Sequence, residues 1–351
     1  MARVRRREEI IFQAEELKSQ AEALLEQGHL EGARETILRA IVQLEAAVGE
    51  SDGELLRFIS VLGIILNRVP ALEEAEVWLK RALEIARQDR IRGTLEEARA
   101  QLDLGFFYDQ NGRTGDAVAH AERAVTILEQ ILSSGPEEEQ EPATWAVGEA
   151  YRLLGMLHSH RLNFTDAEDA FMKSISAYES LGGGIHEEIG RTLIELARLY
   201  RDQMDYERAD LTFRRAHAML ERTIGPWHVD LGFICEELAS LHESLGNPIK
   251  ARELIRKATV TYQHAAGKRS RDYIRSLDHM SAIFVLEENF TEALGFSERA
   301  VKLAEGLLED TDPDLVTLID RLATIHRELG NTREAEELEK RAAKLASKAY
   351  Q

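Results

Sequence analysis

A unit of 42 residues repeats through the chain and constrains its fold more than any other feature. In each unit an alanine is followed seven residues later by a second small residue. Successive units are 42 residues apart, apart from one spacing of 50. The first alanines of the pairs are Ala33, Ala75, Ala117, Ala167, Ala209, Ala251, Ala293 and Ala335. This register indicates a fold that grows by stacking identical supersecondary units.

A third small residue lies twelve residues before each first alanine, next to large apolar side chains. Gly63 follows Leu62, and Gly105 follows Leu104. Apolar positions at i, i+3, i+4 and i+7 describe one face of a helix. Turn residues such as Asn111-Gly112 separate the two halves of a unit. Each unit is therefore predicted to be a hairpin of two antiparallel helices that approach closely at their small residues.

The spacing of small residues favours the tetratricopeptide type of hairpin. HEAT and armadillo units have ~40–47 residues and standard tetratricopeptide units ~34, but the close contacts fit a tetratricopeptide hairpin with lengthened helices. The predicted fold class is all-α, a right-handed α-solenoid of eight 42-residue TPR helical hairpins. A basic leader at 1–10, with Arg3, Arg5, Arg6 and Arg7, precedes a single domain at 11–351. The repeats are expected at about 11–52, 53–94, 95–144, 145–186, 187–228, 229–270, 271–312 and 313–351.

Glycine and proline predict the connections between hairpins. Gly49, Gly183, Gly225 and Gly267 share one repeat position, and left-handed caps at the ends of the second helices are expected there. The spacing of 50 reflects an acidic insertion at 134–142, with sequence SGPEEEQEP. Prolines bracket its acidic run, which predicts a loop.

Two inter-repeat segments resemble the kinesin light chain branch of tetratricopeptide proteins. They are residues 224–230, with sequence IGPWHVD, and residues 311–316, with sequence TDPDLV. That resemblance, which extends to bacterial kinesin light chain-like proteins, implies a module for binding other proteins. In the eukaryotic members the repeats select cargo for a motor, and the bacterial kinesin light chain-like proteins are linked with tubulin-like filaments.

Charge and composition exclude several classes of partner. The formal net charge of −19 repels nucleic acid and anionic lipid, so neither is an expected partner. A single cysteine, Cys235, fits a reducing compartment. No stretch approaches the ~18 apolar residues of a membrane span, and the leader lacks a signal-peptide pattern. The sequence predicts a cytoplasmic protein.

No arrangement of residues predicts catalysis. The sequence has no Walker loop or GxGxxG, and His158 and His160 form the best local pair for a metal. His158 occupies a repeat position held elsewhere by tyrosine, so packing is the simpler explanation. No enzyme activity, cofactor or metal is expected. A scaffold or adaptor is predicted, with a bacterial tubulin-like filament as a candidate partner; the alternative is a regulator that binds a peptide or an enzyme.

In this architecture the first helix of each hairpin lines the inner face. Its exposed positions are expected one residue after the small residue and two or three residues before it. In the early repeats this rule selects apolar side chains, and a charged set continues in the later ones. The predicted partner-binding residues are Val61, Ile64, Leu102, Phe106, Arg152, Met156, Arg191, Arg198, Arg201, His279 and Arg321.

Overall fold

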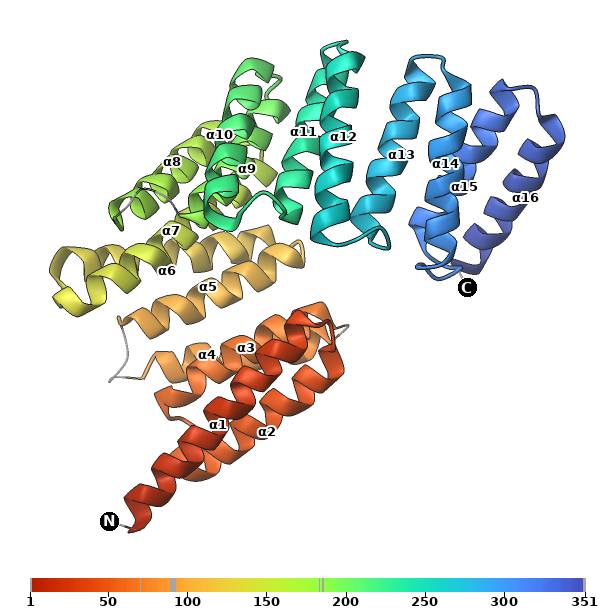
Figure 1. Cartoon of the computed structure of the whole chain (residues 1–351). Helices are drawn as coiled ribbons and strands as arrows, with labels where there is room; N and C mark the ends of the chain where they lie inside the picture. Colours follow the sequence, from red (N-terminus) through yellow and green to blue (C-terminus); the bar gives the residue numbers. More distant parts are fainter. Residues whose placement is uncertain (1, 70, 89–92, 183, 185, 350–351) are drawn as a thin grey trace. The chain divides into compact units, whose positions relative to one another are not determined.

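The computed structural model describes residues 2–69, 71–88, 93–182, 184 and 186–349. Over these residues it contains sixteen α-helices, one short 3-10 helix and no strand (Figure 1). The chain divides into two units, Met1–Gly184 and Ile185–Gln351. Each unit is a stack of four helical hairpins, so the all-α repeat fold expected from the sequence is confirmed.

The first unit contains the hairpins α1–α2, α3–α4, α5–α6 and α7–α8. The second helix of each hairpin contacts the first helix of the next, and the first helices also contact one another. The elements are α1 (Ala2–Glu26), α2 (Leu30–Val48), η1 (Gly53–Leu55), α3 (Leu56–Arg68), α4 (Leu72–Ala86), α5 (Leu95–Gln110), α6 (Thr114–Ser134), α7 (Glu137–His160) and α8 (Phe164–Ser180).

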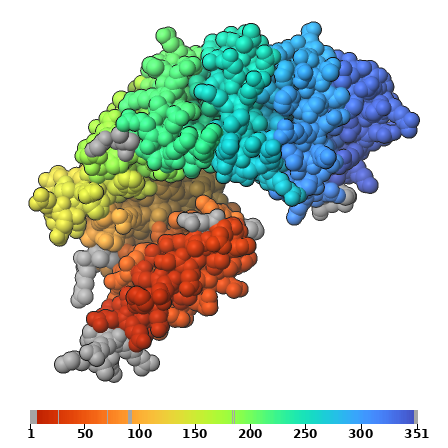
Figure 2. Space-filling view, viewed as in Figure 1, coloured from red at the N-terminus to blue at the C-terminus, as the bar shows by residue number. Residues whose placement is uncertain are grey.

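The second unit repeats the arrangement with α9–α10, α11–α12, α13–α14 and α15–α16. In the space-filling view its hairpins follow one another from green to blue as adjoining bands (Figure 2). The elements are α9 (Glu187–Asp202), α10 (Tyr206–Ile224), α11 (Val229–Ser244), α12 (Pro248–Ala265), α13 (Arg271–Leu286), α14 (Phe290–Glu305), α15 (Pro313–Glu328) and α16 (Thr332–Ala349).

Small residues are buried where the two helices of a hairpin meet. All eight first alanines have no exposed surface. A Cβ on Gly155 of α7 would lie 2.6 Å from ring atoms of Phe171 on α8, so only glycine fits beneath that ring. A Cβ on Gly63 of α3 would similarly lie 2.5 Å from a methyl group of Leu79 on α4. The repeated small residues therefore set the distance between paired helices, as the sequence predicts.

A second register of small residues accommodates the large side chains of the second helices. A Cβ on Gly148 would lie 2.7 Å from the Tyr178 ring, and one on Gly190 would lie 2.5 Å from Leu220. In a later hairpin the sizes are exchanged, because Ile274 and Ala304 occupy the positions of Gly190 and Leu220. The total volume at this contact is thus shared differently between the two helices from one repeat to the next.

The turns inside the hairpins use a left-handed residue five positions before the first alanine. Gly28, Gly112, Gly246 and Gly330 have φ between 69° and 79° there. Leu162, Met204 and Glu288 adopt φ of 61°, 61° and 56° at the same position. Gly49, Gly225 and Gly267 have positive φ at the ends of second helices, as predicted; Gly183 lies outside the described residues.

The insertion at 134–142 is not a loop, and that prediction was wrong. Helix α6 extends to Ser134, Pro136 is the N-cap of α7, and α7 begins at Glu137 with three glutamates in its first turn. Glutamates at a helix N-terminus are stabilised by the helix dipole. The Gln140 side-chain amide donates to the Ile131 and Gly135 carbonyls at 3.2 and 3.3 Å, which satisfies the end of α6. The third and fourth hairpins therefore meet at 135–136, not at 144.

The residues predicted as a basic leader belong to the first helix, since α1 begins at Ala2. Arg7 on this helix lies 3.5 Å from Asp52. The side chains of Arg3, Arg5 and Arg6 are outside the part of the chain that the structure describes.

Candidate interaction grooves

The first unit contains a groove of about 750 Å³ between its first helices. Lys18 and Glu22 come from α1, Leu56, Arg57, Ser60 and Val61 from α3, and Glu96, Arg99, Ala100 and Asp103 from α5. Asp52, η1 and Ala82 of α4 complete the lining. Three consecutive hairpins thus contribute to one site.

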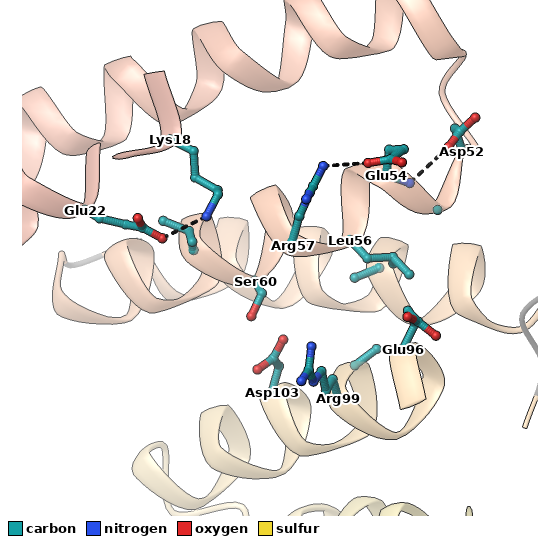
Figure 3. Close-up of a pocket in the computed structure, with 14 residues that line it drawn as sticks. Lys18, Glu22, Asp52, Glu54, Leu56, Arg57, Ser60, Glu96, Arg99 and Asp103 are labelled. Atoms are coloured by element: carbon teal, nitrogen blue, oxygen red, sulfur yellow. Dashed lines mark hydrogen bonds and ion pairs between the residues drawn. The ribbon is translucent and has the colours of Figure 1, made fainter. Parts of the chain in front are cut away.

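Ion pairs fix part of the rim of this groove. Lys18 Nζ lies 3.2 Å from Glu22, and Arg57 contacts Glu54 at 2.6 Å (Figure 3). Arg57 also lies 2.7 Å from Glu15. These ion pairs involve residues of α1, α3 and η1. The charged residues on the α5 side of the groove are Glu96, Arg99 and Asp103.

Asp103 lies at the α5 side of the groove and faces Ser60 on α3, with Arg99 beside it (Figure 3). Burial disfavours the charged carboxylate and raises the pKa of Asp103 to about 6, although the Ser60 hydroxyl and the Arg99 charge act in the opposite direction. The residue is half-buried, so its carboxyl is poorly solvated yet reachable from the groove. It is a negative group whose charge is only partly compensated by its neighbours.

The second unit has a smaller inner groove of about 360 Å³. Arg201, Glu237, Arg275, His279 and Arg321 are among its lining residues, so three of the predicted binding residues meet at one site.

Ion pairs between successive first helices neutralise this second groove. Arg201 pairs with Glu237, and Arg275 lies 2.9 Å from Glu236. His279 Nε2 is 2.8 Å from Glu243, and the Arg321 Nε lies 2.6 Å from Asp278. The buried Glu236 also accepts a hydrogen bond of 2.9 Å from the Tyr262 hydroxyl. Each charged side chain that lines this groove thus has a partner on a neighbouring helix. This series of ion pairs joins adjacent repeats.

The predicted arginines on α9 pair with carboxylates of α9 itself and of α11. Arg198 and Arg201 both contact Glu237, whereas Arg191 pairs with Glu187 and Glu188 and lies 3.6 Å from Asp230. The guanidinium of Arg198 also lies 4.9 Å from the centre of the Phe233 ring.

The apolar set from the early repeats is only partly exposed. Ile64 is 48% exposed and Val61 is half-buried in the first groove. Leu102 is 4% exposed, so its prediction as a surface residue was wrong. It lies three residues before the small residue of α5, and α5 contacts the first helices on both sides, which cover that position.

Phe106, Arg152 and Met156 lie together on α5 and α7. The Arg152 guanidinium is 5.8 Å from the centre of the Phe106 ring, and its Nη1 is 3.8 Å from the Met156 sulfur. This contact joins two adjacent first helices in the first unit, and all three side chains are half-buried.

Asp103 is the residue that sequence analysis missed. It lies two residues before Gly105 and therefore satisfies the rule for inner-face positions. The prediction selected its apolar neighbours Leu102 and Phe106 instead. A carboxylate among apolar residues on an inner helix was the available signal.

The single cysteine is buried in the second unit. Cys235 is 3% exposed, and burial raises the pKa of its thiol to about 11, which disfavours the reactive thiolate. Within the described ranges, no group of three histidine, cysteine or acidic side chains could hold a metal ion. None of the described helices combines the length and apolar character needed to cross a membrane.

Comparisons with known proteins match the sequence to repeat families. One tetratricopeptide repeat model matches residues 147–222 and 279–348, and a second matches residues 98–137. The kinesin light chain-related 3 protein of Arabidopsis thaliana is 22% identical over 250 residues, which are 69% of this chain and 36% of the relative. The chain spans only about a third of the length of the curated relatives of this kind that it matches.

Solved structures share the fold. BtubC (BKLC) from P. vanneervenii has a TM-score of 0.59 at 17% identity, over 67% of this chain and 91% of that protein. A signal transduction ATPase with a tetratricopeptide repeat sensor from Pyrococcus horikoshii has a TM-score of 0.67 at 16% identity, over 96% of this chain and 47% of that protein. With its stacked hairpins and small-residue register, the chain belongs to the tetratricopeptide repeat proteins, and it is similar to kinesin light chain-related proteins.

Proposed function

We propose that this chain is a non-catalytic scaffold or adaptor that binds a protein partner on the inner faces of its repeats. The main support for this proposal is the groove of about 750 Å³, to which side chains from three consecutive hairpins contribute. Its volume lies in the range of about 300–1,000 Å³ that is usual for small-molecule pockets, which is room for a few side chains of a partner. Half-buried apolar residues and charged rims resemble the mixed surface of non-obligate protein interfaces.

The proposed partner-binding residues are the surface-accessible members of the predicted set, divided between the two units. A cytoskeletal filament, such as a bacterial tubulin-like polymer, is the partner class to test first, because the curated relatives are kinesin light chain-related proteins. We propose that the protein acts in the cytoplasm. The residues are Val61, Ile64, Phe106, Arg152, Met156, Arg191, Arg198, Arg201, His279 and Arg321.

Crosslinking mass spectrometry in the native cell tests the proposal, followed by capture with the purified chain. Ile64→Asp on α3 should abolish capture of the crosslinked partner. The matched control is Val77→Asp on α4, since Val77 is 66% exposed on a second helix. Capture that survives Ile64→Asp but not Val77→Asp would place binding on the outer helices and contradict the proposal. Cosedimentation with the polymer tests the filament directly, and a chain that remains in the supernatant excludes it.

The groove volume also supports the alternative, a regulator that binds a peptide or an enzyme. A site of about 750 Å³ fits a few peptide side chains better than a flat filament surface. Peptide pools should then raise the melting temperature, because a ligand of the folded state stabilises it. If the peptide pools leave the melting temperature unchanged and the chain cosediments with the filament, the scaffold is favoured over the regulator.

A further inference from the structure

The two inner grooves differ in how their charges are balanced. In the second unit the carboxylates of Glu236, Glu237 and Asp278 each contact an arginine. A charged ligand would have to displace these pairs. The first-unit groove is larger. Among the described residues, no ion pair between helices neutralises the charged groups on its α5 side. It is therefore the stronger candidate for a charged ligand.

Acidic groups outnumber basic groups around the first-unit groove. Its lining contains three cationic side chains, Lys18, Arg57 and Arg99, against five carboxylates. The carboxylates are Glu22, Asp52, Glu54, Glu96 and Asp103. Lys18 and Arg57 are already held by Glu22, Glu54 and Glu15, so neither is available to compensate the α5 side. Asp52 lies near Arg7 on α1, so the excess negative charge comes from the α5 side, where Arg99 accompanies Glu96 and Asp103. A site with this balance attracts cations and repels anions.

Asp103 gives the groove a specific point of contact. Its carboxyl is half-buried and faces across the groove to Ser60, and among the described residues the exposed Arg99 is the cation that acts on it. A lysine or arginine that reached this carboxyl would form a charge-assisted hydrogen bond in a partly water-excluded position, where such bonds are strong. Binding of a cation would also favour the ionised form of Asp103.

Apolar groups lie within the same groove. Leu56, Val61, Ala82 and Ala100 supply its hydrocarbon surface. The aliphatic part of a lysine or arginine side chain packs well on such a surface while its charged end meets a carboxylate. The groove therefore suits a segment that combines basic and apolar residues.

We infer that the α1/α3/α5 groove binds a basic, partly apolar peptide segment of the partner protein, with a lysine or arginine of that segment on Asp103. This inference rests on the proposed function and specifies the partner at the same inner face. The negative net charge of the chain adds long-range attraction for such a segment.

Fluorescence anisotropy with the full chain and three labelled peptides tests the inference. The probes are GKLAKLAKG, its acidic counterpart GELAELAEG and the neutral GQLAQLAQG. The basic peptide should bind at least tenfold more tightly than the acidic peptide. Asp103→Asn should weaken its binding about tenfold, as expected for loss of one charge-assisted hydrogen bond. The matched control, Glu73→Gln on α4, removes one exposed negative charge outside the groove and should change affinity less than twofold.

The pH dependence separates the groove from general attraction to an acidic protein. Affinity of the unchanged chain should fall several-fold between pH 7.5 and pH 5.5, since Asp103 takes up a proton in that range. The Asp103→Asn chain should show little change over the same interval. Equal effects of Asp103→Asn and Glu73→Gln, or binding of the acidic peptide as tightly as the basic one, would overturn the inference.

The outcome is separable from that of the proposed function. If crosslinked partners are captured in an Ile64-dependent manner but the basic peptide fails to bind, the charge assignment is wrong and the scaffold stands. If the peptide binds as expected and no cellular protein is crosslinked, the groove assignment stands and the scaffold is wrong. Melting curves of each variant confirm that the chain remains folded during the measurement.

Discussion

The exchange of large and small residues between paired helices gives the sharpest test of how the repeats pack. In hairpin α9–α10, Gly190 faces Leu220, and a Cβ at position 190 would lie 2.5 Å from Leu220 Cγ and 2.7 Å from Cδ2. Leu220 is fully buried, so it has little space to retreat. In hairpin α13–α14 the buried Ile274 and Ala304 occupy the corresponding positions. The two hairpins distribute the same contact volume in opposite ways.

Three variants measure this coupling. Gly190→Ala should lower the free energy of unfolding by up to about 2.5 kcal/mol, because overpacking costs about 1–3 kcal/mol and the gain in helix propensity returns about 0.5–1 kcal/mol. Leu220→Ala should cost about 2–5 kcal/mol through the cavity it leaves. Gly190→Ile combined with Leu220→Ala reproduces the α13–α14 arrangement and should be about 1–2 kcal/mol more stable than Leu220→Ala alone, within the usual range for contacting pairs.

Urea unfolding followed by circular dichroism provides the assay. Variants are compared by transition midpoint where the slopes agree, because a changed slope signals altered cooperativity. A double variant that is no more stable than Leu220→Ala alone would refute the idea that volume is exchanged across the hairpin. Ile274→Gly with Ala304→Leu is the reciprocal control and should behave in the same way.

Three further predictions concern single groups. Asp103→Asn should leave the free energy of unfolding unchanged at pH 4 and raise it by roughly 1 kcal/mol at pH 8. The folded-state pKa of Asp103, about 6, exceeds the unfolded value, so the cost of burying its ionised carboxylate grows as pH rises between the two values. Denaturation at both pH values checks this, and a gain confined to low pH would contradict it. Cys235 in the folded chain should react with a thiol reagent at pH 7.5 about 100-fold more slowly than in denaturant, since burial raises the pKa of the thiol to about 11 and lowers the fraction of thiolate. Rapid stoichiometric labelling of the folded chain would exclude this burial. Met204→Gly should raise the melting temperature slightly, because a non-glycine residue at φ 61° is strained, whereas Gly246→Ala at the same repeat position should lower it; equal changes in both would show that the turn conformation does not determine stability.

The repeat register made the fold predictable from the sequence. The alanines at 42-residue intervals specify where helices approach, because only a small side chain permits a close contact. The helical hairpins and most of their boundaries followed from that register. The segment 134–142 was wrongly predicted as a loop. Its glycine and prolines suggested a loop, but contacts at the end of α6 keep the connection to α7 short. Gln140 satisfies the carbonyls at the end of α6, and that interaction joins groups nine and five residues apart in a specific geometry.

The sequence by itself determined the helical repeat and the small-residue contacts, because these depend on local periodicity. Only the tertiary structure decided which inner-face residues are available to a partner. Leu102 obeys the same rule as Ile64 but is covered by neighbouring helices. Likewise, Arg198, Arg201 and Arg321, which were predicted to bind a partner, pair with carboxylates 36 to 43 residues away in the sequence. Asp103 became a candidate because it is partly buried against α3. That burial results from packing between repeats and cannot be inferred from one repeat alone.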